Sequence, residues 1–126
     1  MRKWSEAEIL EGVNINDQEA VKQLFDMYWA LLKLLTIELI GKELPDKNIP
    51  DSVFVKLLRE PHRFKSFRSL QDFLYSSVRS ECLKHIRQHP TQFNMFAEKK
   101  IKKDADRYIF KIEVLRLMRL RQQEGI

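Results

Sequence analysis

The stretch from Ser69 to Gln88, SLQDFLYSSVRSECLKHIRQ, constrains the fold most, because its apolar residues recur at three- and four-residue spacing. That spacing is the period of one helical face, so we expect a helix with one buried side. Ser69 is a suitable N-cap and Pro90 cannot continue a helix, which marks both ends. The stripe expected to be buried comprises Leu70, Phe73, Leu74, Ser77, Val78, Cys82 and Ile86. A cationic flank that favours an anionic partner lies mostly off this stripe: Arg79, Lys84, His85, Arg87 and His89.

The composition extends this helical prediction to the whole chain. Of the 126 residues, 44% are hydrophobic and 33% are charged, with only three Gly and four Pro, which favours helices over strands and turns. The length predicts one domain with one core. We therefore predict an all-α protein, a compact bundle of about four helices followed by a separate C-terminal helix.

Several features bear on location. The only cysteine, Cys82, cannot form an internal disulfide, and no charged-then-apolar leader opens the chain, so the sequence favours the cytoplasm over secretion. The longest apolar segment, Met27 to Ile40, is interrupted by Lys33 and Glu38 and is too short to span a bilayer. We therefore expect no membrane insertion.

Two helices are expected before residue 41. Ser5 and Glu8 have the spacing of a capping box, and Gly12 is positioned to end the short helix that follows. Asn16, with Glu19 three residues later, is the expected N-cap of a long helix that ends at Ile40, before Gly41. The apolar residues of this long helix cover more than one stripe, which predicts that it lies at the centre of the bundle.

A third helix is expected from Ile49 to Arg59, with Pro50 tolerated in its first turn. Its expected core residues are Val53, Phe54, Leu57 and Leu58, whereas Val55 is an apolar residue on the polar face. The following loop, EPHRFKSFR, alternates aromatic and cationic residues. Such a loop can stack bases and hold phosphates. Alternatively, Phe64 and Phe67 close the end of the bundle.

The C-terminal third carries much of the positive charge of a chain whose net charge is +5. We predict a linker over 90–103 and a final amphipathic helix over 104–126, capped by Asp104. The apolar stripe of this helix needs cover. We therefore expect it to pack back on the bundle or to pair with its copy in a homodimer.

The order of these segments, with IPDSVFVKLL and then FLYSSVRSECLKHIR, resembles region 2 of extracytoplasmic-function sigma factors, especially Bacteroidetes-type members. These proteins are promoter-recognition subunits of bacterial RNA polymerase. The resemblance covers residues 4–89, about two thirds of the chain. It implies a region 2 helical domain over 1–89, and the last helix resembles the start of a truncated region 4.

The family pattern of the third helix is close to D-I-V-Q-E-V-F-x-K-L-W, of which this chain keeps Val53, Phe54, Lys56 and Leu57. In the family this helix docks on the coiled coil of the polymerase β′ subunit. The resemblance therefore implies polymerase contacts by Asp51, Ser52, Val55 and Arg59.

The family pattern of the next helix is kept at Phe73, Leu74, Tyr75, Arg79, Ile86 and Arg87, whereas Ser80 stands where Asn is usual. In the family this helix and the preceding loop read the −10 promoter element and capture a base flipped from the non-template strand. The resemblance implies DNA contacts by Lys56, Phe64, Arg68, Tyr75, Arg79, Ser80, Lys84 and Arg87. It also implies an anti-sigma factor as a partner.

The functional expectation is thus a transcription initiation factor domain that binds core RNA polymerase and recognises and melts the −10 element. The alternative is a small helical protein-interaction module without direct DNA recognition. We expect no enzyme, because the sequence has no Gly-rich phosphate loop and no nucleophile motif. We also expect no cofactor and no metal, because Cys82 belongs to the apolar stripe and leaves His85 and His89 without a third ligand nearby.

Overall fold

The computed structural model describes residues 4–40, 48–59, 64–88 and 95–123. These residues form five helices and no strand, which confirms the all-α prediction for this part of the chain. The helices are α1 (Glu6–Asn14), α2 (Gln18–Ile40), α3 (Ile49–Arg59), α4 (Phe67–Gln88) and α5 (Met95–Gln123). Gly41, His89 and Pro90 lie outside the described residues.

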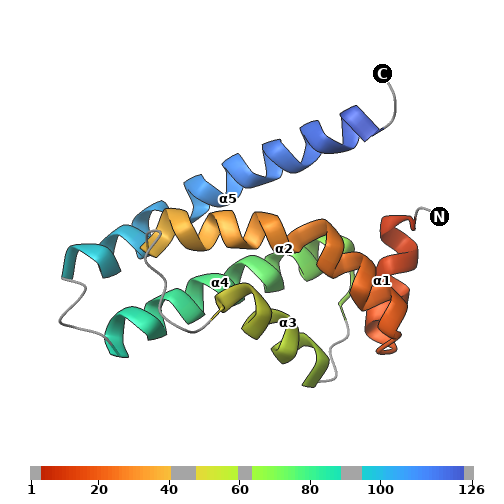
Figure 1. Cartoon of the computed structure of the whole chain (residues 1–126), viewed down its shortest axis with the longest axis horizontal. Helices are drawn as coiled ribbons and strands as arrows, with labels where there is room; N and C mark the ends of the chain where they lie inside the picture. Colours follow the sequence, from red (N-terminus) through yellow and green to blue (C-terminus); the bar gives the residue numbers. More distant parts are fainter. Residues whose placement is uncertain (1–3, 41–47, 60–63, 89–94, 124–126) are drawn as a thin grey trace.

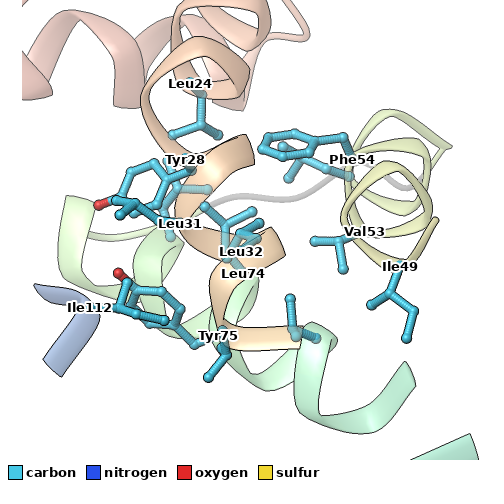
Figure 2. Close-up of a cluster of buried hydrophobic side chains, with 14 of the residues drawn as sticks. Leu24, Tyr28, Leu31, Leu32, Ile49, Val53, Phe54, Leu74, Tyr75 and Ile112 are labelled. Carbon is cyan, nitrogen blue, oxygen red and sulfur yellow. The ribbon is translucent and has the colours of Figure 1, made fainter. Parts of the chain in front are cut away.

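Helix α2 lies at the centre of the bundle, as predicted, and packs against each of the other four helices (Figure 1). It buries residues on several sides because its apolar positions exceed one stripe. In Figure 2, Leu24, Tyr28, Leu31 and Leu32 of α2 lie between side chains of the neighbouring helices. These neighbours are Ile49, Val53 and Phe54 of α3, Leu74 and Tyr75 of α4, and Ile112 of α5.

The start of α1 confirms the capping box. The Ser5 hydroxyl accepts a hydrogen bond from the Glu8 amide at 3.1 Å, and the Glu8 carboxylate accepts one from the Ser5 amide at 3.3 Å. Gly12 does not end α1, which continues to Asn14. Instead Gly12 is buried where α1 meets α2, and a Cβ at this position would lie only 2.3 Å from Cβ of Ala20. The glycine therefore permits a close approach of the two helices.

Two other predicted caps are displaced by one to three residues. Asn16 has a positive φ of 58° in the turn, and Asp17 accepts the hydrogen bond from the Glu19 amide at 3.0 Å. Helix α4 begins at Phe67 because the Ser66 hydroxyl, rather than that of Ser69, accepts from a helical amide, at 3.1 Å. Serine, asparagine and aspartate side chains are all suitable N-caps, so neighbouring residues of these types compete to cap the same helix.

Helix α5 corrects the expected C-terminal arrangement. It begins at Met95, so most of the segment predicted as a linker is helical. It is also not separate, because it packs against α2 and α4 and buries Ile101 and Ile112. The prediction that this helix packs back on the bundle is confirmed. Its C-terminal turns extend away from α2 in Figure 1, and Leu117 and Met118 remain exposed.

None of the described helices combines the length and hydropathy that crossing a membrane requires.

Candidate functional site

An open apolar groove of about 450 Å³ lies between α2 and α3. The groove is lined by residues of both helices: Gln18, Val21, Lys22 and Phe25 from α2, and Asp51, Phe54, Val55 and Leu58 from α3. Two residues implied in polymerase binding, Asp51 and Val55, therefore line the groove. The other two do not: the Ser52 hydroxyl donates a hydrogen bond to the Asn48 carbonyl at 3.2 Å, and Arg59 is exposed at the end of α3.

The groove also contains residues that the sequence pattern assigned to the core. Leu58 is 46% exposed, so its predicted burial is wrong, and Phe25 is 36% exposed. The Phe25 ring packs edge-on against the Phe54 ring, with centroids 5.0 Å apart. Trp29 donates a hydrogen bond of 2.8 Å to Asp51, which joins α2 to α3 beside the groove. Two sequence signals pointed to an additional apolar surface: the surplus of apolar positions on α2 and the apolar Val55 on the polar face of α3.

The residues implied in DNA binding fall into three groups, of which the first lies around the Phe73 ring. The Lys56 ammonium is 5.9 Å from the centroid of this ring, and the Phe64 ring is 5.5 Å from it. Asn14 holds the backbone of Phe64 through two hydrogen bonds of 3.0 and 2.9 Å. Phe64 and Phe67 are both half-buried and pack against the core.

The second group, Ser80, Lys84 and Arg87, lies exposed on the second half of α4. We call these three residues the α4 row. They are three or four residues apart and so share one helical face. Ser76 is exposed one turn earlier, whereas Ser77 is buried. His85, which was expected on the cationic flank, is 6% exposed and belongs to the interior.

The third group, Arg68, Tyr75 and Arg79, lines a cavity of about 640 Å³ between α4 and α5. Tyr75 is only 3% exposed, so it does not lie on the outward face where the resemblance implied it. Its hydroxyl donates a hydrogen bond to Glu113 of α5, and burial together with this bond raises its pKa. Tyr75 and Ser80 are five residues apart and therefore point to different sides of α4.

A partly buried polar cluster connects α5 with α1, α2 and α4. Arg116 pairs with Glu113 at 3.1 Å and with Glu6 of α1 at 3.6 Å. Gln71 of α4 donates a hydrogen bond of 2.7 Å to the hydroxyl of Tyr28. Burial raises the pKa of Tyr28 to about 12, so this phenol stays protonated at neutral pH.

No group of three or more potential metal-ligating side chains occurs within the part of the chain that the structure describes. Cys82 is buried, and burial raises the pKa of its thiol to about 12. A thiol that stays protonated is a poor metal ligand and a poor nucleophile. Comparison of the chain with protein-family models, curated proteins and solved structures finds no match.

Proposed function

We propose that this chain binds single-stranded promoter DNA and docks on core RNA polymerase, as does region 2 of the sigma factors that its sequence resembles. The α4 row is the observation that carries this proposal, because two cations and a hydroxyl share one exposed helical face. Lys84 and Arg87 are suited to phosphate oxygens. The Ser80 hydroxyl is able to donate and to accept a hydrogen bond at a base edge.

The cluster of Lys56, Phe64 and Phe73 supports the same role. Aromatic rings next to a cation provide a stacking surface beside a phosphate-binding charge. Tyr75 is not included in the proposed DNA surface, because α5 covers it. The proposed DNA surface therefore consists of the α4 row and the neighbouring Lys56 cluster, and capture of a base by Tyr75 requires α5 to move.

The α2–α3 groove is the proposed docking surface for the polymerase. It exposes Phe25, Val55 and Leu58 side by side, with Lys22 and Asp51 also in its lining. Exposed apolar patches of this kind mark protein interaction sites. The β′ coiled coil offers a helix of suitable shape for such a groove.

The decisive experiment reverses the charges of the α4 row. Polymerase reconstituted with the Lys84→Glu/Arg87→Glu variant is titrated with a fluorescent random-sequence single-stranded DNA pool. We expect at least tenfold weaker DNA capture, and a salt slope that falls by about 0.7 for each phosphate group that the variant no longer neutralises. Polymerase binding by this variant is expected to be unchanged.

A matched control carries the same charge change elsewhere. Lys103 and Arg119 are exposed on α5, so Lys103→Glu/Arg119→Glu alters net charge equally without touching the α4 row. Equally weakened DNA capture in both double variants would show a non-specific charge effect and would contradict the proposal.

The α2–α3 groove also favours a second function, a helical protein-interaction module that does not contact DNA. This function predicts that the protein fails to bind polymerase but still binds another helical partner through Phe25 and Leu58. A pull-down with purified core polymerase distinguishes the two functions, because only the first requires that complex.

A further inference from the structure

The cavity between α4 and α5 has the size of a small-molecule site. Its volume of about 640 Å³ falls within the roughly 300–1,000 Å³ of known ligand pockets. Arg68, Tyr75 and Arg79 contribute the α4 wall, and Phe110 and Leu117 belong to the α5 wall. Neither the docking groove nor the α4 row forms part of it.

Arg79 is a cation that lines this cavity. Its Nε atom is buried without a hydrogen-bond partner, and no ion pair to Arg79 occurs among the described residues. Arg68, by contrast, pairs with Asp72 at 3.4 Å. A buried guanidinium nitrogen without an acceptor is costly, and a carboxylate is the acceptor whose geometry fits it best.

The negative charges of the cavity limit the charge of a ligand. Asp72 is compensated by Arg68, and Glu113 by Arg116 and the Tyr75 hydroxyl. Asp106 also lines the cavity and is exposed to water. Together with Asp106, these carboxylates disfavour a polyanion such as a nucleotide, so a ligand that pairs with Arg79 should carry only one negative charge.

The α5 wall supplies an apolar surface next to this cation. Phe110 and Leu117 both line the cavity and remain largely exposed, Phe110 at 72% and Leu117 at 55%. Burial of these two side chains under an acyl chain or an aromatic ring would remove their apolar surface from water. The lining therefore matches a molecule with one anionic head and an apolar body.

We propose that the α4–α5 cavity binds an amphipathic monocarboxylate, with its carboxylate on Arg79 and its apolar body against Phe110 and Leu117. This assignment does not depend on DNA or polymerase binding.

A head-group series tests the proposal with the full chain. Decanoate and decylammonium below their micelle concentrations, and decan-1-ol below its solubility limit, are titrated into ¹⁵N-labelled protein and followed by NMR. We expect saturable shifts of α4 and α5 amides with decanoate, about tenfold weaker binding of decan-1-ol, and the weakest binding of decylammonium. Equal affinities for the three head groups, or shifts located outside α4 and α5, would overturn the proposal.

Three variants test the two halves of the site separately. Arg79→Gln is expected to weaken decanoate binding about tenfold and to abolish the preference for the acid over the alcohol. Phe110→Ser is expected to weaken both ligands while keeping that preference, and its exposed position lets the variant fold normally. Arg119→Gln removes an exposed α5 cation that does not line the cavity and should change neither affinity. Unaltered head-group preference in folded Arg79→Gln protein would contradict the assignment, and so would unaltered affinity in Phe110→Ser.

Discussion

The guanidinium of Arg116 lies over the ring of Tyr28, with its central carbon 5.8 Å from the ring centroid. The same side chain pairs with Glu113 on its own helix and with Glu6 on α1. Only 11% of the Arg116 side chain is exposed. One residue of α5 thus contacts both the central helix and the first helix.

Arg116→Ala is therefore expected to lower the free energy of unfolding by about 2 kcal/mol, because it removes the cation–π interaction and leaves Glu113 with one partner fewer. Urea denaturation followed by far-UV circular dichroism measures this change. Arg119→Ala, on the exposed side of α5, should stay within about 0.5 kcal/mol of the parent protein. Similar destabilisation of both variants would show that Arg116 has no special role.

Gly12→Ala is expected to destabilise the protein, although alanine normally favours a helix by about 1 kcal/mol over glycine. The new methyl group would lie 2.3 Å from Cβ of Ala20, so α1 and α2 would have to separate. We expect the free energy of unfolding to fall by about 1–3 kcal/mol, measured by urea denaturation. The double variant Gly12→Ala/Ala20→Gly should recover part of this stability. A stabilised Gly12→Ala protein would contradict the close approach of the two helices.

Leu57 and Leu58 provide a matched pair for the α2–α3 groove. Leu57 is 2% exposed, so Leu57→Ala is expected to cost about 3 kcal/mol of unfolding free energy. Leu58 is 46% exposed, and Leu58→Ala should cost less than about 1 kcal/mol. Chemical denaturation of both variants measures the difference. Comparable destabilisation would place Leu58 in the core and remove the groove.

Alkaline pH is expected to destabilise the fold. Burial raises the pKa of Cys82 from 9.0, and that of Tyr28 from 10.0, to about 12 in each case. Below about pH 9 both groups are protonated in the folded and unfolded chains, and their contribution to stability is fully present. As pH rises from about 9 to 12, the unfolded chain releases these protons first, so the free energy of unfolding decreases.

The limiting slope is about 1.4 kcal/mol per pH unit for each group. Urea denaturation between about pH 7 and pH 11 measures it. In Tyr28→Phe, which has no phenol to ionise, the decrease above about pH 10 should be smaller than in the parent protein. If the free energy of unfolding decreased with the same slope in Tyr28→Phe and in the parent protein, the Tyr28 phenol would titrate equally in the folded and unfolded chains.

The periodicity of the sequence was sufficient to predict most helices and their buried faces. The stripe from Leu70 to Ile86 is buried as expected apart from the half-buried Phe73, because helical spacing alone determines which residues share a face. The capping box at Ser5 was also predictable from the sequence, because its hydrogen bonds join residues only three positions apart.

The candidate sites were less predictable. The resemblance placed Tyr75 and Ser80 on one DNA surface, yet α5 covers Tyr75 and leaves Ser80 exposed. The groove beside Leu58 and the cavity beside Arg79 both form between helices that are distant in sequence. No local pattern specifies which side of a helix receives a distant neighbour.

The sequence by itself thus determined an all-α chain with a central second helix and a fourth helix that is apolar on one side and largely polar on the other. Only the tertiary structure decided that α5 packs on α2 and α4, that Gly12 serves helix packing rather than helix termination, and that Arg79 Nε is buried without a hydrogen-bond partner among the described residues. The physical reason is range: periodicity and capping act within one or two helical turns, whereas burial and charge compensation depend on side chains brought together from separate helices.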